Sequence, residues 1–431
     1  MLNALNFIIG CVLVGTTAAI YSISFAAIIY NGDLGAFLDR GIGLTLIGAS
    51  IMAAGGGLLF SVSGTVSHPQ DVTAVMLAAS AVNITAHAQT LGPEALFITT
   101  AALVALTGLC AAIAATVLGY CRLSRVFEYF PISVMGGFLA ATGYLLLTGA
   151  ISMLLNRKIS LRDIPGIWSA SELHIWLPWI AIGVLYVVLS RTVRSRYALP
   201  VAVITTLAGF YVVLAISPAQ LSDMRNAGLL LGPFPREGLL RGYDASLLEY
   251  IAWPLVLQES PMIVSVAGMV ILGGLLNLHG LHHVTRKSVD LDNDLKAIGV
   301  LNAVSSISGG LVGYPAISTT ILGWRLGLKG LAAAISASVI CVSLALFGTD
   351  VLAVLPKGLF AAIVAYLGLD LLYSWLWLEW KRHTLWEFAI VVGILVTAAS
   401  IGILEALALG LCAAMCGRFI FGSRLVTKSD L

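Results

Sequence analysis

Long apolar stretches alternate with short polar breaks along nearly the whole chain. Runs of about 20 apolar residues can cross the ~30 Å hydrocarbon layer of a bilayer as helices, and lipid offers the backbone no other way to satisfy its polar groups. The pattern predicts fourteen membrane-spanning helices, near 8–30, 41–61, 69–88, 95–119, 131–155, 174–190, 197–217, 255–281, 293–309, 315–326, 329–348, 351–374, 384–402 and 404–422.

The longest polar interruption, residues 217–250, falls between the seventh and eighth predicted helices. It separates a first half, 1–217, from a second half, 255–422, with an extracytoplasmic connection at 218–254 and a short cytoplasmic tail at 423–431. Because each half has an odd number of spans, a structural repeat must be inverted in the membrane, as in many secondary transporters. We expect an all-α polytopic membrane protein with a 7+7 inverted repeat.

Composition predicts that the chain lies in a membrane, and the distribution of charge predicts its orientation there. With 59% hydrophobic and 10% charged residues, the chain has too little polar surface to cover a water-soluble globule. Fifteen lysines and arginines fall on the side of both predicted termini and eight on the other side, so the positive-inside rule predicts that both termini are cytoplasmic. The six cysteines lie mostly within apolar runs, where they are expected to be packing residues.

Two similar polar phrases interrupt the apolar pattern, "SHPQDVTAVM" at 67–76 and "GYPAISTTIL" at 313–322. Each opens the third span of its half after a stretch rich in glycine and serine. Short, Gly/Pro-interrupted segments at corresponding positions of two halves indicate discontinuous helices that meet at a central site. We expect Pro69 and Pro315 in the first helical turns, with the two helix N-termini forming a site for a small anion. The alternative is that both prolines merely begin ordinary helices.

Several longer phrases, in this order and spacing, resemble those of the SulP sulfate-permease family. They include "SISFAAIIYNGDLGAFLDRGIGLTLIGASI", "LLNLHGLHHVTRKSVDLDNDLKAIGVLNAVSSISGGLVGYPAISTTIL" and "YLGLDLLYSWLWLEWKRHTLWEF". The resemblance is closest to bacterial members often linked to cyclic-nucleotide-binding modules, and it covers the transmembrane part of the family without the usual STAS domain. It implies a core domain from spans 1–4 and 8–11 and a gate domain from spans 5–7 and 12–14.

The resemblance also implies a substrate site between the third and tenth spans, approached along the first. The residues carried over to this sequence are Ser22, Ser24, Phe25, His68, Pro69, Gln70, Asp71, Val72, Tyr314, Ala316, Ile317, Ser318 and Thr319. Two departures concern this site: His282 replaces an acidic residue of the eighth span that many members have, and Thr319 replaces an arginine that some animal relatives have on the tenth. His282 is therefore a candidate for coupling, and so is Asp71, because an acid inside the membrane commonly has a functional role.

The function expected is secondary active transport of a small anion (sulfate, bicarbonate, chloride or a dicarboxylate) by movement of the core against the gate. No nucleotide-binding or hydrolase motif is present, so we expect no enzyme activity. We expect a homodimer in the bacterial inner membrane, surrounded by the lipid bilayer, with no nucleic-acid partner and no cofactor apart from a coupling sodium ion or proton.

Three other functions stay open. A nucleobase permease shares the architecture but usually has carboxylates on the eighth and tenth spans, which are missing here. A passive anion channel is compatible with the same fold. A metal transporter or metalloenzyme is the third, because His279, His282 and His283 share one helical face at a spacing suited to zinc; no HExxH motif accompanies them. The nearby "DLDND" phrase lacks the glycine of a calcium loop, so Asp290 or Asp292 is expected to cap the ninth span.

Overall fold

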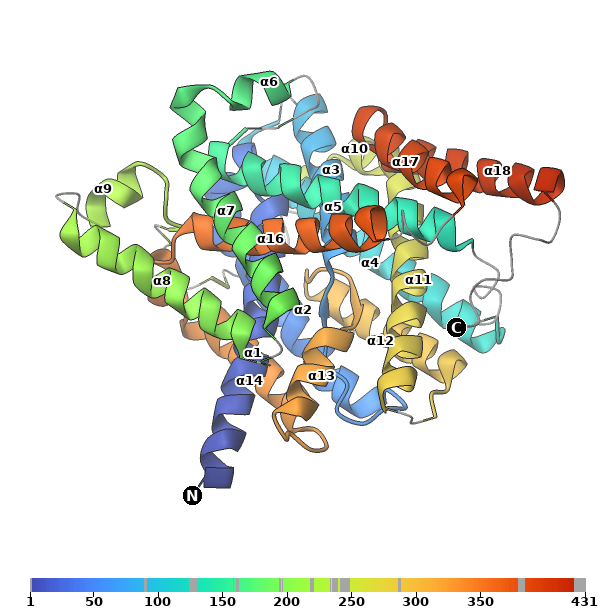
Figure 1. Ribbon diagram of the computed structural model, residues 1–431, viewed down its shortest axis with the longest axis horizontal. Helices are drawn as coiled ribbons and strands as arrows, with labels where there is room; N and C mark the ends of the chain where they lie inside the picture. The colour runs from blue at the N-terminus through green and yellow to red at the C-terminus, as the bar shows by residue number, and fades with distance from the viewer. Residues whose placement is uncertain are drawn as a thin grey trace.

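The computed structural model describes residues 2–421 apart from 89–90, 124–130, 158, 160–162, 194, 196, 218–220, 233, 235–238, 241–248, 286–287 and 379–383. Each of the fourteen predicted ranges coincides with a helix (Figure 1). These helices are α1 (Leu2–Ile29), α2 (Leu38–Leu59), α3 (Asp71–His87), α4 (Pro93–Tyr120), α5 (Ile132–Leu155), α7 (Ala170–Thr192), α8 (Ala198–Ile216), α11 (Ser260–Thr285), α12 (Leu291–Ile307), α13 (Ile317–Arg325), α14 (Ala332–Phe347), α16 (Lys357–Leu372), α17 (Leu385–Ser400) and α18 (Ile403–Phe421).

Shorter elements join these helices. They are η1 (Gly32–Phe37), α6 (Ile164–Ile167), α9 (Leu221–Asn226), α10 (Trp253–Gln258), α15 (Thr349–Ala353) and η5 (Tyr373–Trp377), a π-helical turn that continues α16. The expected connection at 218–254 is described only in part, and the expected tail at 423–431 lies outside the described residues. The fold is mostly helical, as expected, but it also contains one small sheet, made of β1 (Ser67–Pro69) and β2 (Gly313–Pro315).

Not every helix is long enough to cross a membrane. Within the described parts of the chain, eight apolar helical segments reach that length, and three further apolar helices have 10–17 residues. The helix α13 has only 9 residues, or about 14 Å at 1.5 Å per residue, because β2 precedes it where a full span would be helical. The predicted count of fourteen crossings and the inverted repeat therefore stay predictions.

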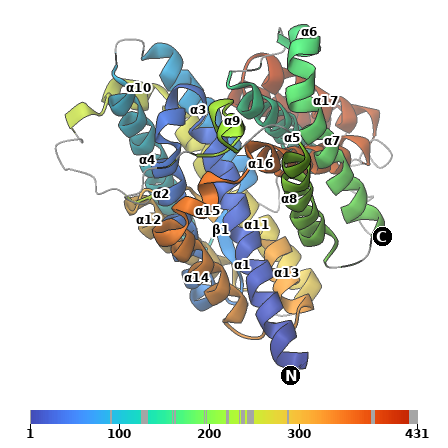
Figure 2. The same cartoon turned by 90° about the vertical axis from the view of Figure 1, so that its left-hand side faces the viewer.

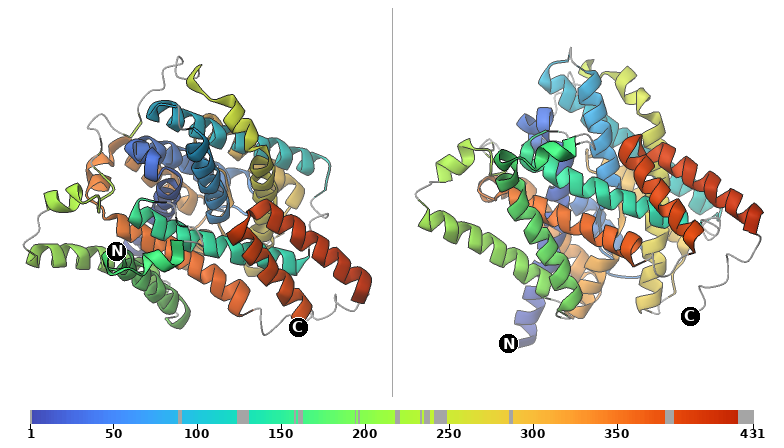
Figure 3. Two further views of the ribbon diagram at one scale, coloured as in Figure 1. Left: turned by 90° about the horizontal axis from the view of Figure 1, so that it is seen from above. Right: turned by 45° about the horizontal axis from the view of Figure 1, so that its top comes forward.

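The helices pack in two sets, which lie side by side in Figure 2. In the first set, α4 packs on α12, and α14 packs on α1 and α2; in the second, α5 packs on α16 and α17, and α7 on α16. The helices α17 and α18 form a hairpin beside α5 (Figure 3). We call α1–α4 and α11–α14 the core set, and α5, α7, α8 and α16–α18 the gate set. Their assignment as domains that move against each other stays a prediction.

Glycine permits a close backbone approach within the core set, between α2 and the turn before β2. A Cβ atom on Gly48 would lie 2.6 Å from the Cα of Gly310 and 2.6 Å from the Oγ of Ser305. The first contact is with backbone, so a rotamer change cannot relieve it. We predict that Gly48→Ala lowers the thermal midpoint of the detergent-solubilised protein, because overpacking of this kind costs about 1–3 kcal/mol.

A matched control for this prediction is Gly268→Ala in α11, where a Cβ would meet no atom within 4 Å. Alanine is favoured over glycine inside a helix, so this variant should match or exceed the stability of the unmodified protein. A Gly48→Ala protein as stable as the control would show that α2 and the turn can separate without cost.

Candidate functional site

The two polar phrases singled out in the sequence form the small sheet at the centre of the core set. The strands β1 and β2 are antiparallel, with Ser67 opposite Pro315, His68 opposite Tyr314 and Pro69 opposite Gly313. All six strand residues are buried. Each strand leads directly into a helix, β1 into α3 and β2 into α13. The pairing therefore ties the beginnings of the two helices to each other.

Threonines in the first turn of each helix reinforce this pairing from both sides. The hydroxyl of Thr320 in α13 accepts the backbone N–H of Val66, at 3.0 Å, and donates to Ala316. The hydroxyl of Thr73 in α3 donates to Gln70 and, at 3.4 Å, to the carbonyl of Val312. Val66 and Val312 are the residues that precede the two strands, so each helix is bonded to the chain that enters the other strand.

His68 links the strand β1 to the helix α13. Its Nδ1 lies 2.7 Å from the carbonyl oxygen of Pro69, and its Nε2 lies 3.0 Å from the hydroxyl oxygen of Thr319. A carbonyl oxygen can only accept, so Nδ1 carries the hydrogen and Nε2 accepts from Thr319. His68 and Thr319 are both buried. The geometry thus gives these two predicted site residues a role in holding the half-helices together.

Only some of the predicted site residues have accessible side chains. Ser318 is exposed, and Gln70, Asp71 and Ile317 are half-buried. The Gln70 amide donates to the carbonyls of His68 and Tyr314, at 3.0 and 3.3 Å. One carboxylate oxygen of Asp71 accepts the N–H of Val72, the next residue, at 2.8 Å. Among the described residues, no lysine or arginine forms an ion pair with Asp71.

The prolines do not lie where the sequence analysis expected them. Pro69 and Pro315 end the strands, and α3 and α13 begin two residues later, after Gln70 and Ala316. The expectation that they occupy the first helical turn is therefore wrong. The physical reason is that strand pairing keeps both segments extended up to the prolines. A proline has no N–H to donate to a strand partner, so the end of a strand is a position where it is tolerated.

The residues predicted on the first span are packed away from solvent. Ser22, Ser24 and Phe25 are buried, and the two serine hydroxyls donate to carbonyls four residues back, Ala18 and Ile20. Val72, Tyr314 and Ala316 are buried as well. The α1 residue beside the sheet is instead Tyr21, whose ring centroid lies 5.7 Å from that of His68 and 6.3 Å from that of Phe25.

The sequence analysis missed two contacts at the candidate site. Tyr21 lies four residues before Phe25, so helical periodicity could have placed both on one face. Asn277 of α11 accepts the N–H of Ile317, the first residue of α13, at 3.3 Å through its side-chain oxygen. Its amide donates to Gly273 one turn earlier. Nothing in the sequence indicates this cap, because Asn277 and Ile317 are 40 residues apart.

The described histidine side chains of α11, those of His279 and His282, do not assemble a metal site with other described ligands. In the part of the chain that the structure describes, no group of three or more His, Cys, Asp or Glu side chains could hold a metal ion. Nδ1 of His279 donates to the carbonyl of Leu275, at 2.9 Å, and His282 is exposed. The side chain of His283 lies outside the described residues. Asp290 caps α12 by accepting the N–H of Asn293, as predicted.

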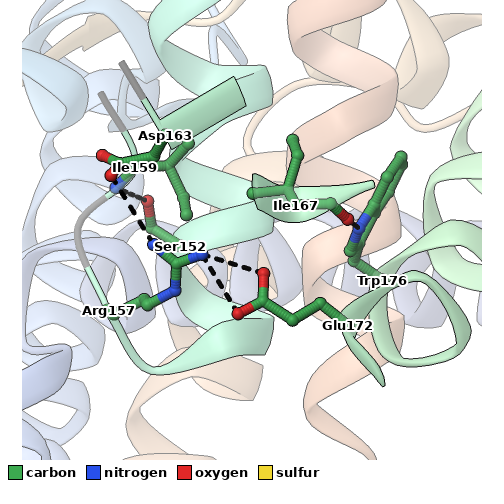
Figure 4. Close-up of polar contacts among 7 residues, drawn as sticks. All are labelled: Ser152, Arg157, Ile159, Asp163, Ile167, Glu172 and Trp176. Atoms are coloured by element: carbon green, nitrogen blue, oxygen red, sulfur yellow. Dashed lines mark hydrogen bonds and ion pairs between the residues drawn. The ribbon is translucent and has the colours of Figure 1, made fainter. Parts of the chain in front are cut away.

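A cavity of about 630 Å³ separates the core set from the gate set at one end of the molecule. It is lined by the second half of α3, including Val75 one turn after Asp71, and by the ends of α1, α5 and α17. Arg157 stands at its wall, where it donates to both carboxylate oxygens of Glu172, at 3.1 and 2.8 Å (Figure 4). This hydrogen bond raises the pKa of Arg157, so the guanidinium stays protonated and its charge is offset by the carboxylates of Glu172 and Asp163.

These observations define a class of protein: a helical membrane protein in which a buried antiparallel ribbon, β1–β2, joins two half-helices. Residues 6–396 match the sequence model of the sulfate permease family. The chain belongs to this family, and it is a multi-pass membrane transporter.

Two curated relatives are similar to the chain at low identity. The bicarbonate transporter BicA of Picosynechococcus is 22% identical over 424 residues, covering 95% of this chain and 70% of that protein. The vacuolar basic amino acid transporter VSB1 of Saccharomyces cerevisiae is 25% identical over 290 residues, covering 65% of this chain. The match spans only 28% of the length of the yeast protein, so that protein's activity as a whole is no more than a guide for a proposal.

Solved structures show the same fold. The transmembrane domain of the cyanobacterial bicarbonate transporter BicA superposes with a TM-score of 0.66 at 16% identity, covering 95% of this chain and 97% of that one. The murine Solute Carrier 26 family member A9 anion transporter, in its inward-facing state, gives a TM-score of 0.72 at 16% identity, covering 96% of this chain and 68% of that one. Likeness at such identity establishes the fold alone.

Proposed function

We propose that this protein is a secondary active transporter of a small anion. The observation that carries the proposal is the β1–β2 ribbon, which fixes the starts of α3 and α13 against each other and leaves Ser318 and Gln70 accessible beside them. The first N–H groups of a helix have no intrahelical partner and point outward with a partial positive charge. Two such starts favour an anion without a buried cationic side chain.

The contacts at the site narrow the groups that are free to bind. The N–H of Ile317 is taken by Asn277 and that of Val72 by Asp71. Ser318 forms no described side-chain hydrogen bond, and the N–H of Thr320 donates to Ala316. The hydroxyl of Ser318 and the N–H groups of Ser318 and Thr319 are therefore the available donors at the start of α13. A few donors of this kind select for charge and size, which suits bicarbonate, chloride, sulfate or a dicarboxylate alike.

The two curated relatives suggest which other substrates should be considered. BicA is a bicarbonate transporter and VSB1 a basic amino acid transporter, so the family architecture is associated with both signs of charge. A cationic amino acid would need carboxylates, and Asp71 is the single acidic residue in the two phrases that form the ribbon and the helix starts. A nucleobase permease would need them on α11 and α13, which contain none. We therefore favour the anion.

The test is uptake into proteoliposomes that contain the purified protein. Radiolabelled sulfate, bicarbonate, chloride, a dicarboxylate and, as a contrast, arginine are offered with and without sodium and proton gradients. We expect saturable uptake of at least one anion and none of arginine. Uptake that rises without saturation would identify a channel, and uptake of arginine alone would reverse the assigned sign of charge.

Coupling to a cation is proposed for Asp71. An ionised carboxylate beside the anion would repel it, whereas a bound proton or sodium ion removes the repulsion, and acids inside membranes commonly have such roles. We predict that Asp71→Asn keeps anion uptake but loses its dependence on the proton or sodium gradient. The alternative is a purely structural carboxylate, which the short contact to the N–H of Val72 favours. In that case the asparagine variant would keep the gradient dependence, and exposed His282 would be tested next.

A further inference from the structure

A second polar cluster lies in the gate set, where α7 and α16 end. We call Arg191, Asp370, Tyr373 and Ser374 the release cluster. The Nη2 of Arg191 donates to the carboxylate of Asp370 at 2.6 Å and to the hydroxyl of Ser374 at 2.7 Å. Its guanidinium carbon lies 4.2 Å from the ring centroid of Tyr373. Tyr373 and Ser374 belong to the π-helical turn η5, a type of irregularity that is frequent at functional sites.

Arg191 keeps unused binding capacity. All of its described hydrogen bonds involve Nη2, although a guanidinium has five N–H donors in a planar fork. The edge formed by Nη1 and Nε has no partner among the described residues. The Arg191 side chain is 31% exposed. Asp370 holds the guanidinium in one place and offsets most of its charge.

The release cluster lies beside the half-helix site but on the other side from the cavity. The helix α16, which carries Asp370, packs on α1, the helix whose Tyr21 ring lies beside His68. The cavity is bounded by Arg157, which pairs with Glu172 at the start of α7. Arg191 lies 19 residues further along the same helix, or about 28 Å away. An anion that leaves the half-helix site in the direction opposite to the cavity therefore passes the release cluster.

We propose that Arg191 is a second anion-binding residue, which accepts the transported anion from the half-helix site through its Nη1–Nε edge before release at the end of α7. This inference rests on the proposed function. The role of Asp370 in this proposal is to weaken the binding of the anion by Arg191. A transport site must bind the anion strongly enough for it to enter and weakly enough for it to leave. An unpaired arginine would retain the anion, whereas a neutralised one releases it.

The experiment measures KM for each face of the membrane separately, in proteoliposomes of known protein orientation and with the anion found in the uptake panel. We expect Arg191→Gln to raise KM about tenfold at the face where α7 ends, the effect of losing one charged hydrogen bond, and to leave KM at the cavity face unchanged. Arg191→Lys keeps the charge without the fork and should fall between. Asp370→Asn should lower KM at the same face and slow turnover.

Two controls separate this from a structural ion pair. Arg40→Gln removes the pair with Glu94, and because neither residue lines the cavity or belongs to the release cluster, it should change neither KM. The exchange Arg191→Asp with Asp370→Arg restores a pair but moves the positive charge to α16. If it restores normal KM at both faces, the pair is structural and the inference is wrong.

The outcomes also separate this inference from the proposed function. Transport of an anion with unchanged or symmetrically changed KM in Arg191→Gln would overturn the role of Arg191 alone. Failure of the unmodified protein to transport any anion would overturn both. A variant that elutes as aggregate in size exclusion is replaced by Arg191→Lys, for which an unchanged KM at both faces overturns the inference equally.

Discussion

Replacing Ser318 with leucine is expected to abolish anion uptake while leaving a folded protein in the membrane. Ser318 is exposed at the second position of α13 and makes no described hydrogen bond, so the larger side chain meets no packed neighbour. It would, however, remove the free hydroxyl and cover the first N–H groups of the helix with an apolar group. An anion would then have to give up its hydration without replacement, which costs far more than a typical binding energy.

Two further variants make this result specific. Ser318→Ala removes the hydroxyl without covering the N–H groups and should weaken apparent affinity by about tenfold. Ser265→Leu places the same side chain at a half-buried serine of α11 that donates to the carbonyl of Pro261, and should transport normally. Uptake by Ser318→Leu within twofold of the unmodified protein, measured at equal amounts of reconstituted protein, would place the site elsewhere.

The helices could be predicted because their signal is local. An apolar run of sufficient length specifies a helix in lipid regardless of its neighbours, and each of the fourteen predicted ranges contains one. The position of the short helices was also readable, since glycine and proline interrupt the runs at "SHPQ" and "GYPA". How many of these helices cross the membrane depends on the bilayer as well as on the chain, so the sequence and the structure leave that count a prediction.

The ribbon could not be predicted because its signal is not local. Strands of three residues are too short for any periodic pattern, and His68 pairs with Tyr314, 246 residues away. The same holds for the cap on Ile317 by Asn277, which joins α11 to α13. Conversely, Ser22 and Ser24 looked suitable for a site because they are polar, but a serine in a helix can satisfy itself on the carbonyl four residues back, and both do.

The bond between His68 and Thr319 leads to the second large effect. It is a side-chain contact between β1 and α13, and both residues are buried. Thr319→Val keeps the branched shape but leaves Nε2 of His68 without a donor, at a cost of about 1–3 kcal/mol. We expect α13 to lose its fixed position relative to β1, so that the anion no longer meets both helix starts. The apparent affinity for the anion should fall by about tenfold or more.

The decisive measurement is a double-mutant cycle on transport affinity and on thermal stability. Thr319→Ser retains the hydroxyl and should behave as the unmodified protein, which excludes an effect of volume loss alone if its affinity is normal. His68→Phe removes the acceptor, so the double variant with Thr319→Val should cost clearly less than the sum of the single changes, as expected for residues in direct contact. Additive losses would show that His68 and Thr319 act independently, and the half-helices would then be held by the backbone ribbon and by Thr73 and Thr320 without help from the imidazole.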